Sequence, residues 1–76
     1  MKHYLKIEQP YYDAVKEGNK TFEIRFNDRG YQKGDTVELC VPHTTLPALT
    51  AKIGYVTSFN QRDEYVVFSL LNVKEE

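Results

Sequence analysis

Residues 18–30 read GNKTFEIRFNDRG, and from position 20 onward apolar and polar side chains alternate. Successive side chains of an extended strand point to opposite faces, so this alternation predicts a strand over 21–27. One face would carry Phe22, Ile24 and Phe26. The opposite face would carry Glu23 and Arg25. We expect the apolar face to lie against the core and the charged face to point away from it.

The segment before this strand predicts a short helix of about two turns. Pro10 suits the first helical turn, because its missing N–H has no intrahelical partner there. Tyr11, Ala14 and Val15 are three and four residues apart and would form one apolar face. Gly18 suits the left-handed position that ends a helix. A helix this short must be held by packing against the rest of the fold.

Four further stretches have the character of strands, at 4–8, 36–41, 49–58 and 65–73. Gly54 interrupts the third of them and suggests a bulge. The fourth is apolar on both faces, which predicts a strand with neighbours on both sides. We expect the last three residues, 74–76, to fray.

These elements predict the fold class. A chain of 76 residues forms one domain, here 1–76, near the lower size at which a single hydrophobic core suffices. Five strands and one helix are too few for a parallel doubly wound sheet. We therefore expect an α+β, mostly β fold: a small, mostly antiparallel barrel with the helix after the first strand packed at its side. Closing the barrel would remove exposed strand edges.

Composition narrows the classes of protein. The single Cys40 cannot form an internal disulfide, and His3 and His43 have no second cysteine near them to complete a zinc site. We expect no metal and no cofactor. The sequence has neither the apolar run of a signal peptide nor that of a membrane span, so we expect a cytoplasmic monomer that does not contact membranes.

Net charge sets a limit on nucleic-acid binding. Ten Lys and Arg against eleven Asp and Glu give a net charge of −1. Strong nucleic-acid binders usually have an overall basic excess, which this chain lacks. An anionic partner must therefore be held by a local patch.

The charged face of the strand at 21–27 has two interpretations. Glu23 and Arg25 could form an exposed ion pair, worth less than about 1 kcal/mol. Alternatively, Lys20 joins them to line a pocket between the helix and the sheet. There Lys20 and Arg25 would meet an anionic or carbonyl group, while Glu23 orients them or accepts a hydrogen bond.

Two further basic residues could extend such a patch. Arg29 lies on the loop after the strand, where it is either a solvated turn residue or a phosphate contact. Lys6 lies opposite Leu5 and Ile7 on the first strand. It joins the patch if that strand lies beside the one at 21–27, and is otherwise an ordinary exposed lysine.

Gly18, Lys20, Glu23 and Arg25 spell GxKxxExR. In this motif the chain resembles the ASCH domain (activating signal cointegrator homology), a β-barrel family similar to the PUA RNA-binding domain. The surrounding segments HYLKI, PYYDAV, GNKTFEIRFNDRGYQKGD, VEL and YVVFSL look like a small branch of that superfamily found in bacteria and phages. The resemblance covers nearly the whole chain. It implies binding of RNA or a nucleotide in a cleft lined by Lys20, Glu23 and Arg25.

Some ASCH proteins are amidohydrolases that deacylate N4-acetylcytidine, using the motif lysine, a threonine three residues later and a distant glutamate. Here Lys20 matches the lysine, but Glu23 stands at the threonine position, and a carboxylate cannot take over the part of that hydroxyl without a different mechanism. We therefore expect a binding module for RNA, a nucleotide or a modified nucleoside. Two alternatives stay open: an enzyme acting on an acylated or modified nucleoside through Lys20 and Glu23, and a protein-interaction or phage-accessory domain.

Overall fold

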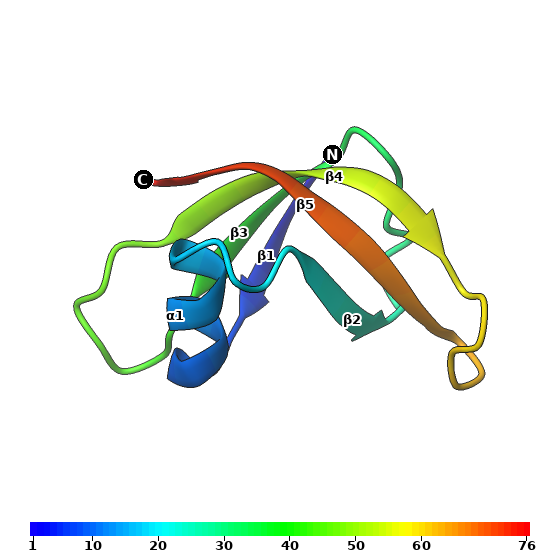
Figure 1. Ribbon diagram of the computed structural model, residues 1–76, viewed down its shortest axis with the longest axis horizontal. Coiled ribbons are helices and arrows are strands. Elements are labelled where there is room, and N and C mark those ends of the chain that lie inside the picture. The colour runs from blue at the N-terminus through cyan, green and yellow to red at the C-terminus, as the bar shows by residue number, and fades with distance from the viewer.

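The structure is a computed structural model that describes residues 1–76. Its elements in chain order are β1 (Lys2–Lys6), α1 (Gln9–Lys16), β2 (Phe22–Phe26), β3 (Thr36–Cys40), β4 (Leu49–Thr57) and β5 (Tyr65–Glu75). The five strands form one strongly curved sheet, a half-barrel, and α1 lies beside one end of it (Figure 1). The predicted fold class, mostly β with one short helix after the first strand, is confirmed. No helix of the structure has the length and apolar character needed to cross a membrane.

The order of strands in the sheet is β1-β3-β4-β5-β2. β1 and β3 run parallel, whereas every other neighbouring pair is antiparallel. The strand β5 has a neighbour on each side, as its continuously apolar sequence predicted. The first two strands of the chain, β1 and β2, are therefore the two edge strands of the sheet.

Arginine side chains bridge the gap between β1 and β2, where no backbone ladder forms. β1 bonds to β3 through alternate residues, so the carbonyls of Tyr4 and Lys6 turn to its other edge. Arg25 Nη2 donates to Lys6 O at 2.9 Å, and Arg29 Nη1 donates to Tyr4 O at 3.0 Å. The half-barrel thus satisfies the carbonyls of an exposed edge with side-chain donors instead of a fifth strand pairing, between β1 and β2.

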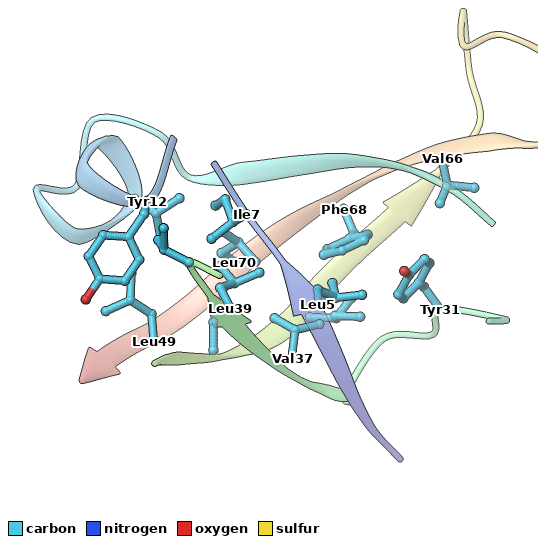
Figure 2. Packing of buried hydrophobic residues seen from close by; sticks show 14 residues of the cluster. Leu5, Ile7, Tyr12, Tyr31, Val37, Leu39, Leu49, Val66, Phe68 and Leu70 are labelled. Atoms are coloured by element: carbon cyan, nitrogen blue, oxygen red, sulfur yellow. The ribbon is translucent and has the colours of Figure 1, made fainter. Parts of the chain in front are cut away.

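The core is one cluster of fourteen buried hydrophobic residues on the concave side of the sheet. Leu5, Leu39 and Phe68 come from three different strands and gather there with Tyr31 from the loop before β3 (Figure 2). Tyr12 anchors α1 to this cluster, and its hydroxyl donates to Pro47 O at 2.7 Å. Packing against the sheet therefore holds a helix of only eight residues in place.

The aromatic residue on the buried face of α1 differs from prediction, whereas the predicted burial of Val15 is confirmed. The helix turns Tyr12 and Val15 into the core, whereas Tyr11, expected on the buried face, is 51% exposed. The two buried residues are three apart and share one face, which places Tyr11 about 100° away from Tyr12 around the helix. Tyr11 is consequently free to face the space between α1 and β2.

The charged face of β2 points to the interior, so the predicted orientation of this strand is wrong. Pairing with β5 places Glu23 opposite Phe68 and Arg25 opposite Val66, and both partners lie in the core. Directly opposite residues share one face of a sheet, so the register of β2 on β5 turns the charges inward. The three apolar residues expected in the core are instead 42–51% exposed: Phe22, Ile24 and Phe26.

The C-terminal residues are paired, so the prediction that they fray is wrong. β5 continues to Glu75, which lies opposite Leu49 of β4. Glu75 also forms an ion pair with Lys16 of α1 at 2.6 Å, and Glu76 N donates to Ala48 O at 2.9 Å. These contacts fasten the end of the chain to the sheet and to the helix.

The bulge predicted at Gly54 is confirmed, because the pairing of β4 with β5 shifts register between Ile53 and Val56. A Cβ atom at position 54 would lie 2.5 Å from Ser69 Oγ and 2.9 Å from Leu71 Cδ1. Glycine is needed here for close approach of the two strands.

A buried polar contact joins β1 to the turn before β3. His3 is buried beside the ring of Tyr31, and its Nε2 lies 2.8 Å from Asp35 Oδ2. The terminal amino group of Met1 and the backbone N–H of Gln32 also donate to this carboxylate. The contact with His3, more than these two bonds, holds the pKa of Asp35 below its ordinary value.

This lowered pKa predicts how stability changes with pH. Asp35 binds a proton less readily in the folded than in the unfolded chain. Its stabilisation is therefore complete above the ordinary carboxyl pKa of about 3.9 and is lost as the pH falls through the lower folded-state value. We expect Asp35→Asn to lower Tm at pH 7 and to flatten the fall of Tm below pH 4. Asp63→Asn, at an exposed turn, is the control; equal pH profiles for the two variants would contradict this account.

The bridging arginine outside the strands gives a second prediction. Arg29→Ala leaves Tyr4 O without its side-chain donor, so the free energy of unfolding should fall by about 0.5–1 kcal/mol. Urea denaturation measures the change, with Lys33→Ala as the control for loss of an exposed cation. An Arg29→Ala variant as stable as Lys33→Ala would show that the bridge does not hold the edge.

Candidate functional site

The end of α1 fixes where Lys20 begins its approach to β2. Gly18 takes the left-handed conformation, with φ of 83°. Gly18 N donates to Val15 O at 3.1 Å and Asn19 N donates to Ala14 O at 2.9 Å, which is the Schellman pattern. Lys20 N donates to Ala14 O as well, at 3.0 Å. Hydrogen bonds thus join the end of α1 to Lys20, which lies two residues before β2.

Glu23 is the centre of a compact ion cluster. Its Oε1 accepts two hydrogen bonds from Arg25, from Nε at 2.9 Å and from Nη2 at 2.7 Å. Its Oε2 accepts a bond from the ammonium of Lys20. The Glu23 side chain is 5% exposed, against 19% for Lys20 and 25% for Arg25. Two cations therefore compensate a carboxylate that would otherwise be too costly to bury.

Lys20 also connects the cluster to its surroundings. Its Nζ donates to Phe22 O at 2.8 Å. The same atom lies 5.7 Å from the ring centroid of Tyr11 and 5.1 Å from that of Phe22, within the range of cation–π attraction. The ammonium thus lies within reach of one aromatic ring of α1 and one of β2.

A cavity of about 560 Å³ opens where β1, α1 and β2 meet. This volume lies within the usual range for small-molecule sites, about 300–1,000 Å³. Nine residues line it: Lys6, Ile7, Glu8, Tyr11, Lys20, Phe22, Glu23, Ile24 and Arg25.

Four of the five residues singled out from the sequence come together here. Lys20, Glu23, Arg25 and Lys6 all line the cavity, whereas Arg29 lies outside it and binds the edge of β1. The interpretation of Glu23 and Arg25 as an exposed ion pair is wrong, because Glu23 is buried.

Sequence reasoning missed three polar or aromatic members of the lining: Tyr11, Glu8 and Phe22, which was expected in the core. Tyr11 stands next to Tyr12, and helical spacing alone did not show which of the two rings is buried. Glu8 precedes the helix and makes no side-chain cap bond with it. Its position in the lining depends on how β1 turns into α1, for which the sequence offers no signal.

The charges of the lining nearly balance. Lys20 and Arg25 against Glu23 leave one net positive charge, and Lys6 and Glu8 offset each other. The lining contains no Ser, Thr or Cys side chain. Its evident chemical capacity is therefore to donate N–H hydrogen bonds to an oxygen-bearing or anionic group, beside aromatic and aliphatic side chains.

Comparison with known proteins finds relatives without an assigned activity. The chain is 46% identical over 37 residues to an uncharacterised 12.9 kDa protein in the GpA 3' region of Escherichia phage P2. The aligned segment is 49% of this chain and 34% of the phage protein, so the match spans about one third of that relative.

Residues 2–70 match the family described as "Domain of unknown function (DUF3850)". The matched range begins at β1 and extends into β5, and it contains every residue that lines the cavity. The chain therefore belongs to the DUF3850 family.

Proposed function

We propose that this protein is a binding module for a nucleotide or an RNA end, held in the cavity between α1 and β2, on a scaffold of the ASCH and PUA-like type. One observation carries the proposal: a buried carboxylate holds two cations in the wall of an open cavity. The resemblance of GxKxxExR to the ASCH motif supports it from the sequence.

The orientation of β2 favours a functional cluster over a purely structural one. The strand exposes three large apolar residues and buries Glu23 with its partners, although the reverse arrangement would be the ordinary one. Replacing buried ion pairs by apolar residues is often neutral or stabilising. Departures from local sequence rules of this kind are expected at functional sites.

Charge limits the kind of nucleic acid. A cavity with one net positive charge, in a chain of net charge −1, offers few phosphate contacts. Tight binding to a long duplex needs many such contacts and depends steeply on salt. A mononucleotide or the end of an RNA strand fits the charge balance better.

The residues of the lining favour binding over hydrolysis. A deacylase of the amidohydrolase type would need a hydroxyl nucleophile, and no Ser or Thr side chain lines the cavity. Lys20 and Arg25 each donate to a carboxylate and to a backbone carbonyl, which suits positioned donors for a bound ligand.

The cluster of Lys20, Glu23 and Arg25 also gives a prediction about the free energy of unfolding. Glu23→Gln removes the negative charge between two cations, so the free energy of unfolding should fall by about 1–3 kcal/mol. Urea denaturation tests this, with Glu17→Gln, at an exposed carboxylate, as the matched control. Equal stability of the two variants would mean that Glu23 does not hold the cluster together.

Binding is tested by titrating the ¹⁵N-labelled protein with nucleoside monophosphates and short RNA oligomers at low salt. We expect amide shifts around the cavity and, for the RNA oligomers, a slope of log K against log salt of roughly −0.7 to −1.4, for one or two neutralised phosphates. Lys20→Ala and Arg25→Ala should each weaken binding about tenfold or more, since each removes a charged donor.

Two controls separate a lost site from a damaged fold. Lys33→Ala and Arg29→Ala remove cations outside the cavity and should retain the affinity of the wild type. The amide spectra of all variants show whether each is folded. A wild-type protein that binds neither mononucleotides nor RNA at low salt would refute the proposed function.

A further inference from the structure

The two cations of the cluster keep hydrogen-bond donors that the protein does not use. An ammonium has three N–H groups, and Lys20 donates two of them, to Phe22 O and to Glu23 Oε2. A guanidinium has five N–H groups. Arg25 donates three of them to Glu23 and Lys6 O, one from Nε and two from Nη2, so the two on Nη1 have no partner in the protein. Three charged N–H donors of the lining are therefore available to a ligand.

Acceptors are nearly used up in the same part of the cavity. A carboxylate offers about four acceptor positions, and the carboxylate of Glu23 already receives three bonds. The main chain of Ile24 adds one N–H and one carbonyl, because strand alternation turns it away from β5 and toward the gap. This pair and the hydroxyl of Tyr11, which can both donate and accept, leave the charged donors in excess.

The remaining carboxylate of the lining is that of Glu8, which is exposed. Its negative charge is offset by the positive charge of Lys6, which is exposed as well. Hydrogen bonds from groups in contact with water are worth less than those from partly buried ones. Lys20 and Arg25, at 19% and 25% exposed, therefore have more influence on which ligand is bound than Glu8 has.

A neutral oxygen acceptor fits these donors better than a phosphate does. The cluster has one net positive charge, whereas a phosphate monoester carries about −1.5 to −2 at pH 7. A carbonyl oxygen needs donors and no balancing charge. Tyr11 and Phe22, both half-exposed and close to the ammonium, are rings on which a planar base can stack, and such stacking is worth about 1–3 kcal/mol per base.

We infer that the cavity selects nucleobases with an oxo group at pyrimidine C4 or purine C6, such as uracil and hypoxanthine, over the matching bases with an amino group at that carbon, cytosine and adenine. The oxo oxygen accepts hydrogen bonds from Lys20 Nζ and Arg25 Nη1. An amino group at the same place is itself a donor and cannot accept these bonds. This inference rests on the proposed function and specifies its ligand.

Matched nucleotides test it on the unaltered protein. Isothermal titration compares UMP with CMP and IMP with AMP, pairs that share sugar and phosphate and differ in the oxo or amino group and in whether the neighbouring ring nitrogen carries a proton. We expect UMP and IMP to bind about tenfold more tightly than their partners, since the amino forms leave charged donors unpaired. Inorganic phosphate is a third arm and should compete poorly with UMP.

The outcomes separate the two claims. Equal affinity within both pairs, or tighter binding of CMP and AMP, refutes the oxo preference and leaves the proposed function standing. Competition by inorganic phosphate as effective as that by UMP also refutes it, because the donors then hold the phosphate. Absence of binding by all four nucleotides refutes the oxo preference, and it refutes the proposed function as well if the short RNA oligomers also fail to bind.

Two variants locate the preference. Arg25→Lys keeps the positive charge but removes the Nη1 donors, so the UMP to CMP ratio should fall to about twofold or less. Tyr11→Leu, at an exposed helix position, should weaken UMP and CMP by the same factor and leave the ratio unchanged. A ratio unchanged in folded Arg25→Lys would overturn the role given to this guanidinium; the comparison of wild-type affinities stands without either variant.

Discussion

The bonding of Glu23 to Lys20 and Arg25 governs both the fold and the cavity. The carboxylate is buried on the face of β2 that meets the core, and the two cations make its burial tolerable. Each cation then reaches a backbone carbonyl, Lys20 that of Phe22 and Arg25 that of Lys6. One acidic side chain thereby positions the donors that bond to backbone carbonyls of both edge strands, β1 and β2. The cavity lies between these two strands.

Bridging by side chains also explains why a cavity exists. Strands joined by a backbone ladder lie about 4.7–4.9 Å apart, which would leave no space for a ligand between β1 and β2. The longer reach of a guanidinium holds the two strands together at a greater separation. A half-barrel of 76 residues can thus protect its edges and still contain an opening of about 560 Å³.

Much of the fold followed from local patterns in the sequence, because alternation and the positions of Pro10 and Gly18 define elements independently of the rest of the chain. The orientation of β2 did not follow. A period of two residues separates two faces without saying which is inside, and the register of Glu23 on Phe68 decides it. The motif predicted which side chains gather, but only the three-dimensional path of β1 showed that Arg29 binds Tyr4 instead of the cavity.

The outward face of β2 has a consequence for the behaviour of the protein at high concentration. An edge strand with exposed Phe22, Ile24 and Phe26 is a template on which a second chain could add a strand. The ammonium of Lys20 covers the carbonyl of Phe22 at this edge, as a gatekeeper charge does in other β proteins. Lys20 thus occupies an acceptor at this edge that a pairing strand would need.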